Sequence, residues 1–498
     1  MTGTMTGQDY PQEADIVIVG CGPVGAMLAN LLGMQGITTL VLDREAAIYN
    51  LPRAIQFDDE VMRLLQTAGL AEEMAPLVRV VPGMRFVDDT GRLLLDWSRP
   101  VECGRQGWSE SYRFHQPELE QVLRDGLSRF PGVSLRLRSS VFAIDQEPDA
   151  AVVRCEDLTT GRLHRCRARY VVGCDGAGSL VRRLIGENMD DLGFNERWLV
   201  VDVLLKRPRP DLGDHSVQHC SKQRPATYVR GIGERRRWEI TVLPGDDEAR
   251  IVQPGFVREL LSRWVSPEEI DIERSALYTF RSAVATKWRS GRLLIAGDAA
   301  HLTPPFLGQG MCAGMRDVGN LAWKLGRVLR GLNDDSLLDT YQSERAPHVR
   351  EYIELAVRLG GLINTKAMAD AVPRSVLDGA EVAQMRSIKP RLGPGIANGW
   401  NGHSGEIAPQ PLLYGGQRLD DAVGYRYAAV MEPSFAAQLP RETWVRLEAR
   451  DATIVTGDGE IGAWLRDAGA PAVLVRPDRY VLGAAHSNQE LAALAALI

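Results

Sequence analysis

The stretch that decides the fold is Asp15-Ile-Val-Ile-Val19, followed by Gly20-Cys-Gly22-Pro-Val-Gly25. The first part is a β-branched run, which is typical of a buried parallel strand. The second part is a GxGxxG turn, and a helix-like segment over residues 24–35 comes after it. A second strand pattern over residues 38–43 ends in Asp43. Strand, glycine turn, helix, strand and acid in this order predict a dinucleotide-binding βαβ unit.

Each glycine of the turn has a physical task. Gly20 permits the tight turn, Gly22 lets the backbone approach a pyrophosphate, and Gly25 lets the helix pack closely on the strand. The helix start presents free N–H groups to the phosphates. Asp43 lies about 20 residues further on, where an acid can accept a hydrogen bond from a ribose hydroxyl. The motif alone does not distinguish FAD from NAD.

Two further glycine motifs follow at a distance. Residues 170–179 contain a strand pattern that ends in Asp175-Gly176, and residues 293–301 contain another that ends in Gly297-Asp298. The second motif continues through Pro304-Pro305-Phe-Leu-Gly-Gln-Gly310 into a helix pattern over residues 318–330. Taken alone, each could be an ordinary tight turn of an α/β protein. We expect all three motifs to meet at one cofactor.

With these three motifs in this order, the sequence resembles the p-hydroxybenzoate hydroxylase-like family, the group A FAD-dependent aromatic hydroxylases. Within the family it is most similar to the 3-(3-hydroxyphenyl)propionate hydroxylases and their polyketide-hydroxylase relatives. Supporting stretches are residues 112–120, 224–229, 237–239 and 297–325. The resemblance implies that FAD is the cofactor and that NADH or NADPH is a co-substrate. It implies the following cofactor-binding residues: Gly20, Gly22, Pro23, Val24, Gly25, Asp43, Arg44, Arg53, Gln116, Asp175, Gly297, Asp298, Pro305, Gly308, Gly310 and Met311.

The resemblance also implies a role for each of these residues. Asp43, where the family usually has Glu, would hold the adenosine ribose. Arg44 and Arg53 would lie near the adenine and the pyrophosphate. Gln116 would touch the flavin side of the cofactor, and Asp298 would bind the ribityl chain.

The third motif would lie against the flavin ring. Pro305 and the backbone of residues 308–311 would contact the isoalloxazine, with N–H groups aimed at its pyrimidine edge. Those donors at a helix N-terminus favour negative charge, which reduced flavin carries at that edge. Asp175 would serve the docking of both FAD and NAD(P)H.

The predicted fold class is α/β, with three parts. A discontinuous, Rossmann-like FAD-binding domain comprises residues 1–179 and 286–388. An inserted antiparallel β-sheet over residues 180–285 would roof the flavin and hold the substrate. A thioredoxin-like α/β domain comprises residues 389–498 and begins with a Pro- and Gly-rich stretch. That domain contains no Cys, which excludes disulfide chemistry there, and we expect it to serve packing or dimerisation.

The substrate-binding residues are the least determined part of the site. The candidates are polar side chains on the inserted sheet, Gln218, His219, Tyr228 and Arg230, together with Pro305. His219, Tyr228 and Arg230 are the candidate catalytic residues, because a phenol is activated by a nearby base or proton path. Strand alternation puts Tyr228 and Arg230 on one face, and a buried Arg facing the flavin would suggest a substrate carboxylate.

The predicted reaction is NAD(P)H- and O2-dependent hydroxylation of a phenol, ortho to its hydroxyl. A 3-(3-hydroxyphenyl)propionate-like acid is the first expectation for the substrate, from the resemblance only. The alternative is an FAD monooxygenase of another type, an epoxidase or a Baeyer–Villiger-like enzyme, acting on a polyketide or another aromatic compound. Product analysis separates these possibilities, because lactone formation changes the carbon skeleton and hydroxylation does not.

Composition limits the other possibilities. The 498 residues carry a formal net charge of −6 without a basic run, which argues against a nucleic-acid partner. No uninterrupted apolar stretch approaches the length of a membrane span. The odd number of cysteines, 7 with no CxxC pair, fits free thiols in a reducing cytoplasm and gives no metal site.

Overall fold

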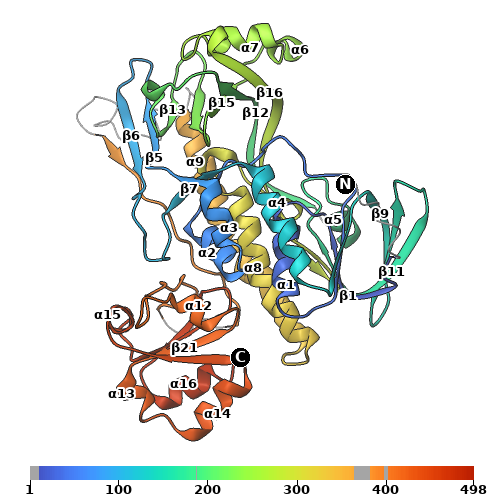
Figure 1. Cartoon of the computed structure of the whole chain (residues 1–498), viewed down its shortest axis with the longest axis vertical. Helices are drawn as coiled ribbons and strands as arrows, with labels where there is room; N and C mark the ends of the chain where they lie inside the picture. The colour runs from blue at the N-terminus through green and yellow to red at the C-terminus, as the bar shows by residue number, and fades with distance from the viewer. Residues whose placement is uncertain (1–9, 187, 364–381, 397–401) are drawn as a thin grey trace, which may run out of the picture.

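The computed structural model describes residues 10–186, 188–363, 382–396 and 402–498. The remaining residues, 1–9, 187, 364–381 and 397–401, lie outside the described part, including the start of the predicted FAD-binding domain and a piece of the Pro- and Gly-rich stretch. Figure 1 shows three parts along the long axis. The C-terminal unit lies at one end, and the sheet that carries α6 (Glu248–Ile251) and α7 (Pro254–Leu261) lies at the other. Between them lie α1 (Pro23–Gly33), α4 (Gln116–Gly126) and α8 (Gly310–Leu329).

The first sheet is the predicted dinucleotide-binding sheet. Its strands are β1 (Glu13–Val19), β2 (Thr39–Leu42), β8 (Val133–Arg136), β9 (Ser139–Gln146), β10 (Ala151–Asp157), β11 (Leu163–Gly173), β17 (Arg289–Ser290) and β18 (Leu293–Ile295). They run in the order β17-β18-β11-β1-β2-β8, with β9 and β10 as an antiparallel extension. β18, β11, β1, β2 and β8 are parallel. β2, β18 and the carboxyl-terminal parts of β1 and β11 are buried apolar runs, as strands covered on both faces must be.

The register of this sheet brings the three glycine motifs together. Val19 pairs with Gly173, and Gly173 pairs with Ile295. The carboxyl ends of three adjacent parallel strands therefore lie side by side, and each strand leads directly into one motif. Ligands of open α/β sheets bind at this edge.

Helices cover this sheet and connect it to the rest of the chain. α1 packs against both α8 and α4. The helices of this part are α1 (Pro23–Gly33), α2 (Asp59–Thr67), α3 (Ala71–Met74), α4 (Gln116–Gly126), α5 (Leu180–Ile185), α8 (Gly310–Leu329) and α9 (Asp339–Ile363). A small sheet has the order β3 (Gln56–Asp58), β7 (Ser111–Phe114) and β4 (Val78–Val80); β3 directly precedes α2, and β7 directly precedes the loop into α4.

The second sheet has nine strands in the order β19-β16-β12-β15-β14-β13-β5-β6-β20. They are β5 (Gly83–Val87), β6 (Leu93–Ser98), β12 (Met189–Leu205), β13 (Ser216–His219), β14 (Ala226–Arg230), β15 (Arg235–Thr241), β16 (Ile270–Ala285), β19 (His301–Leu302) and β20 (Ala383–Gln384). The central strands are antiparallel, as predicted for the insert. β5 pairs in parallel with β13, so this sheet also takes in residues that precede the insert. The predicted domain bounds remain a prediction.

The two faces of the second sheet have different coverings. One face packs against α6 (Glu248–Ile251) and α7 (Pro254–Leu261) through a cluster that includes Leu199, Val201 and Trp238. We call it the outer face. The alternate residues, such as Trp198 and Asp202, lie on the other face. We call this the inner face.

The C-terminal unit has the predicted thioredoxin-like arrangement. Its sheet has the order β22-β21-β23-β24, with one parallel and two antiparallel pairs. Its elements are α12 (Leu419–Val423), β21 (Tyr427–Met431), α13 (Pro433–Ala436), α14 (Arg441–Ala449), β22 (Ala452–Thr456), α15 (Glu460–Asp467), β23 (Ala472–Val475), β24 (Val481–Ala485) and α16 (Asn488–Leu494).

Two buried ion clusters hold this unit on the rest of the molecule. Arg63 of α2 donates to both carboxylate oxygens of Asp420, at 2.6 and 2.9 Å. Arg476 donates to both oxygens of Glu344 in α9, at 2.8 and 2.7 Å. Bidentate pairs of this kind fix orientation, and removing one partner leaves a buried charge. Among the described helices, none is long and apolar enough to cross a membrane.

The glycine turn generates the first prediction. A Cβ atom at Gly25 would lie 2.0 Å from the carbonyl oxygen of Gly20, whereas one at Gly22 would have no atom within 4 Å. We therefore expect Gly25→Ala to destabilise the fold by about 2 kcal/mol, the usual size of an overpacking effect. Gly22→Ala, the matched control, should leave the thermal unfolding midpoint of the flavin-free protein within a degree or two. Equal midpoints for the two variants would contradict this account of the turn.

Candidate active site

The three glycine motifs are in direct contact. A Cβ at Gly20 would lie 2.5 Å from the carbonyl oxygen of Cys174, which directly precedes Asp175. A Cβ at Gly314 would lie 2.6 Å from a methyl of Val24 and 3.0 Å from the Cα of Gly297. Because all three contacts leave no room for a side chain, the motifs must pack as one unit. The expected meeting of the motifs is therefore what the structure shows.

Gly22, unlike the other glycines of these motifs described above, has open space where a side chain would be. This space marks where a ligand fits. It is the N-cap of α1, with Pro23 as the first helical residue, and the space beside it is open. The first N–H groups of a helix lack intrahelical partners and attract anions. This open cradle fits the pyrophosphate of a dinucleotide.

Asp43 lies beside the same turn, but it also has a structural task. Its two carboxylate oxygens accept hydrogen bonds from the N–H groups of Cys21, at 2.6 Å, and Glu45, at 2.8 Å. Arg124 of α4 donates to the carbonyl of Cys21, at 2.8 Å, and lies 3.9 Å from Asp43. Arg124 was not among the predicted residues. Arg44, which was, pairs with Glu45 at the surface.

Gln116 fixes the loop that carries Arg53. Its Oε1 accepts from the N–H groups of Arg53 and Ala54, at 2.8 and 2.7 Å. From the inner face of the second sheet, Arg237 donates to the carbonyls of Pro52 and Arg53, both at 2.7 Å. The loop is therefore held from two domains, and the side chain of Arg53 itself is exposed.

Asp175 caps α5, because its Oδ2 accepts from the N–H groups of Leu180, at 2.7 Å, and Val181, at 3.3 Å. Its other oxygen is buried without a hydrogen-bond partner among the described residues. A buried acceptor without a donor is costly, so this oxygen fits a role in ligand binding.

Asp298 is exposed to solvent although protein surrounds it closely. This crowding raises the pKa of its carboxyl, and the positive charges of His301 and Arg53 oppose the rise. The turn beneath it is held by Asp317, which accepts from the N–H of Gly297 at 3.1 Å and pairs with His301 at 2.6 Å. Asp298 is thus free to bind a ligand, whereas His301 is buried in the support of the turn.

The Pro305–Gly310 turn ends at the start of α8. Residues 305–307 form a single helical turn, Gly308 has a φ of +65°, and Gly310 and Met311 begin the 20-residue helix. Gln309, the residue before the helix, accepts from Arg316 at 3.0 Å and donates to Asp58 at 3.1 Å. Arg316 also pairs with Asp58 and, at 2.8 Å, with Glu60. The helix start is therefore fixed by a fully buried ion cluster.

The inner face of the second sheet packs on this turn. Trp198 and Phe194 contact the ring of Phe306, with centroids 5.7 and 5.5 Å away. Arg113 of β7 bridges the two parts, because it donates to Gln56 and, at 2.7 Å, to Ser216. These contacts identify the inner face as the one that faces the cofactor motifs.

Acidic and basic groups alternate on the inner face. Asp202 pairs with Arg237 at 2.7 Å and with Arg274 at 2.6 Å. Glu239, two residues from Arg237 on the same strand face, lies 3.9 Å from it. Burial raises the pKa of the Glu239 carboxyl, and the charge of Arg237 opposes the rise. A carboxyl with a raised pKa holds a proton more firmly than an ordinary carboxyl, and such groups are common at functional sites.

The predicted substrate residues divide between the two faces. Gln218 lies on the inner face, where it accepts from Thr227. His219 and Tyr228 lie on the outer face: the indole N–H of Trp264 donates to His219 at 3.1 Å, and Tyr228 packs on Trp238.

Arg230 belongs to the outer face too. It contacts exposed Asp214 at 3.3 Å and the carbonyl of Gly233 at 2.9 Å. Burial also lowers the pKa of His219 to about 4, so its ring is neutral at pH 7. The shared face of Tyr228 and Arg230 was predicted, but that face is turned away from the cofactor motifs. This placement argues against catalytic roles for His219, Tyr228 and Arg230.

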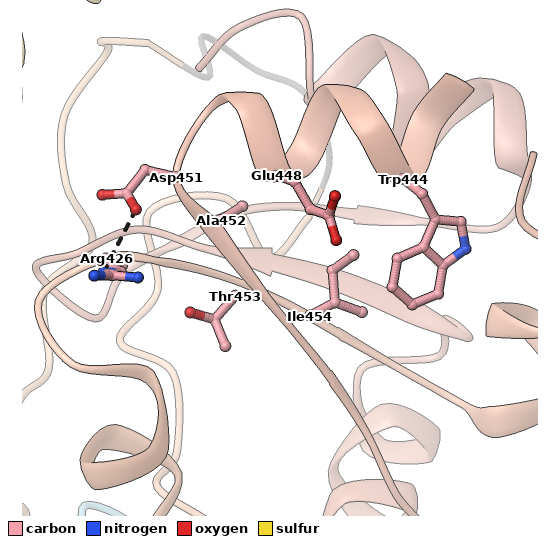
Figure 2. A pocket seen from close by; sticks show the side chains of 7 residues that line it. All are labelled: Arg426, Trp444, Glu448, Asp451, Ala452, Thr453 and Ile454. Atoms are coloured by element: carbon pink, nitrogen blue, oxygen red, sulfur yellow. Dashed lines mark ion pairs between the residues drawn. The ribbon is translucent and has the colours of Figure 1, made fainter. Parts of the chain in front are cut away.

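A cavity of about 390 Å³ lies on the C-terminal unit, away from these motifs. Figure 2 shows its wall, with Trp444 and Glu448 on one helix above Thr453 and Ile454 on a strand, and the ion pair of Arg426 and Asp451 at one end. Its lining contains none of the cofactor-motif residues. Among the described residues, no cluster of His, Cys, Asp or Glu is arranged to hold a metal ion.

Comparison with known families agrees with this geometry. The model of the FAD binding domain family matches residues 13–356, and the HcaD C-terminal domain matches residues 405–498. Among solved structures, aklavinone-11 hydroxylase in complex with FAD and aklavinone has a TM-score of 0.81 at 21% identity, covering 98% of this chain and 99% of that one. The flavin-dependent monooxygenase PieE has a TM-score of 0.80 at 20% identity, with the same coverage. These two show the shared fold.

Curated relatives cover nearly the whole chain. A probable NADH-specific resorcinol 4-hydroxylase from Rhodococcus jostii (strain RHA1) is 39% identical over 97% of this chain and 94% of its own length. A 3-(3-hydroxy-phenyl)propionate/3-hydroxycinnamic acid hydroxylase from Paraburkholderia xenovorans (strain LB400) is 32% identical over 95% of this chain and 88% of its own length. From the motif geometry, the family match and these relatives, the chain belongs to the FAD-dependent aromatic hydroxylases.

Proposed function

We propose that this hydroxylase uses NADH and O2 to add a hydroxyl group to a phenolic ring, ortho to the existing hydroxyl, in the space between the Pro305–Gly310 turn and the inner face of the second sheet. The observation that carries the proposal is the juxtaposition of that turn with a sheet face rich in charged groups. Oriented polar groups next to an apolar wall are typical of small-molecule sites. The relative named for NADH specificity supports NADH as the electron donor.

The residues present fit FAD. The open backbone at Gly22 would take the pyrophosphate, Asp298 the ribityl chain, and the first N–H groups of α8 the pyrimidine edge of the flavin. FAD, when bound, would supply electron transfer from NADH and the oxygen chemistry. The helix N-terminus at Gly310 would favour negative charge on the neighbouring ring edge.

The protein must orient the substrate ring and keep water from the reacting atoms. Trp198, Phe194 and Phe306 form an apolar wall beside the turn, and all three are buried. Flat aromatic side chains of this kind pack well on a phenol ring. We infer that this wall sets the position of the ring.

Glu239 is the inner-face group that we propose to accept the phenol proton. Loss of that proton makes the ring more electron-rich, and therefore more reactive toward an electrophilic oxygen. Glu239 is buried on the face that contacts the turn, and its pKa is raised. Among the predicted candidates, His219 and Tyr228 are on the other face and cannot serve without a rearrangement of the sheet.

The reaction generates a direct prediction. The purified protein should be yellow, release FAD on denaturation, and consume NADH faster when a phenol is added. The product should keep its carbon skeleton and gain one hydroxyl ortho to the first. A colourless protein that takes up no FAD, or NADH consumption that no phenol stimulates, would contradict the proposal. NADPH serves as the matched control donor and should support a lower kcat/KM.

A second prediction concerns pH. A protonated Glu239 cannot accept a proton, so kcat should fall as the pH drops through the pKa of this carboxyl, which lies above the ordinary value for Glu. Glu239→Gln should lower kcat by about 100-fold, a typical general-base effect, and remove this acidic limb from the pH profile. Phenols that are more acidic, such as fluorinated ones, should lose less activity in the variant. A loss of the same size for every phenol, with the limb retained, would exclude this role.

A further inference from the structure

Two buried arginines near the Pro305–Gly310 turn have no carboxylate partner in the described part of the chain. Arg99, which follows β6, is 6% exposed, and Arg113 of β7 is 3% exposed. Arg99 donates to the hydroxyl of Ser111 at 2.8 Å and lies over the ring of Trp97. Arg113 donates only to neutral groups, those of Gln56 and Ser216. The Nε atoms of both arginines are buried without a hydrogen-bond partner.

Three other buried arginines nearby each have a carboxylate partner. Arg237 and Arg274 share Asp202, and Arg316 pairs with both Asp58 and Glu60. A buried charge that lacks a counter-ion is costly and is retained where it has a task. Arg99 and Arg113 stand apart from this pattern.

The two guanidinium groups lie on the same side of β7. Ser111, which holds Arg99, and Arg113 are two residues apart on β7, so their side chains lie on the same face of that strand. Burial, together with the charge of Arg99, lowers the pKa of Arg113 to about 9, while the charge of Glu239 opposes the shift. Arg113 is therefore charged at neutral pH, and the charges of the two guanidinium groups repel each other.

Both arginines also border the turn that carries the flavin-side residues. Arg99 lines a cavity together with Leu307 and Gln309. Gln56, the partner of Arg113, lies against Gly308, where a Cβ would be 3.1 Å from its amide carbon. The pair therefore lies next to the space proposed for the substrate.

The acids around this cavity do not neutralise the pair. Asp58 is engaged by Arg316 and Gln309. Glu110 lines the cavity and is near enough for its charge to act on Arg99, but forms no ion pair with it. Lys389, a third cation of the lining, pairs with Asp59 at 2.5 Å.

We propose that Arg99 and Arg113 form the specificity site for a carboxylate on the phenolic substrate. This inference rests on the proposed function and names its substrate class: phenols with an acidic side chain. The neutral oxygens of Gln56 and Ser216 hold Arg113, and that of Ser111 holds Arg99, until a carboxylate takes their place. Charge-assisted hydrogen bonds to a carboxylate are about twice as strong as neutral ones.

A carboxylate site would distinguish between the substrates for which the two relatives are named. Resorcinol is a neutral diol, whereas 3-(3-hydroxyphenyl)propionate carries a carboxylate. Although the relative named for resorcinol has the higher identity of the two, the unpaired arginines favour the acid for this chain.

The test compares two ligands of nearly the same shape. The FAD-loaded, oxidised protein is titrated calorimetrically with 3-(3-hydroxyphenyl)propionate and with 3-(3-hydroxyphenyl)propan-1-ol, in which an alcohol replaces the carboxylate. The wild type should bind the acid at least about tenfold more tightly. Equal affinities would overturn the inference, and this comparison needs no variant to fold.

Variants then assign the effect to the two residues. Arg113→Gln and Arg99→Gln should each weaken binding of the acid by about tenfold or more and change binding of the alcohol by less than about twofold. The matched control is Arg85→Gln, because Arg85 is an exposed residue of β5 that pairs with Asp96, and it should leave both affinities unchanged. If the variants weaken binding of the acid and of the alcohol equally, the arginines have only a structural role and the inference is overturned.

NADH consumption distinguishes this inference from the proposed function. If resorcinol and the alcohol stimulate NADH consumption and the acid does not, the hydroxylase function stands and the carboxylate site is wrong. If the acid binds with the expected preference and no phenol stimulates NADH consumption, the carboxylate site stands and the proposed function is wrong.

Discussion

The rest of the structure depends on the buried guanidinium of Arg316. It joins α8 to Asp58 and Glu60 of the β3–α2 segment, and it holds Gln309, the residue before the helix. Burial of one cation with two carboxylates is stabilising only while all partners are present, and loss of one typically costs about 3–5 kcal/mol. The position of the α8 N-terminus, and so of every backbone donor offered to the flavin, is set by this cluster.

The same cluster makes the C-terminal unit part of the active-site support. Tyr480 donates to Glu60 at 3.0 Å, so the unit reaches the cluster directly. Arg63 with Asp420, and Glu344 with Arg476, secure the unit on either side. These contacts tie the unit to the residues that support the start of α8. The thioredoxin-like unit therefore packs on α2, α8 and α9.

Much of this arrangement could be predicted from the sequence. A β-branched run followed by a glycine turn is a local signal, and three such signals sufficed to place Gly20, Asp175 and Asp298 at one sheet edge. The faces of the second sheet could not be predicted in the same way. Alternation shows that Tyr228 and Arg230 share a face, but which face meets the cofactor depends on α7 and Phe306, which are distant in the chain.

Long-range pairing explains the other residues that were missed. Arg99 follows β6, which joins the second sheet through β5 and its parallel pairing with β13. Parallel pairing between segments about 130 residues apart leaves no local pattern in a sequence. Glu239 was missed for a related reason. An acidic residue in a strand usually points to solvent, and only the packing of the inner face against distant parts of the chain shows that this one is buried.

The central claim is that the substrate lies on the inner face, against the Pro305–Gly310 turn. A crystal structure of the FAD-loaded protein with 3-(3-hydroxyphenyl)propionate tests it most directly. The account predicts the phenol ring between the Trp198–Phe306 wall and the flavin, with the carboxylate within hydrogen-bond distance of Arg113 and the hydroxyl toward Glu239. A ring bound on the outer face, near His219 and Tyr228, would contradict the account.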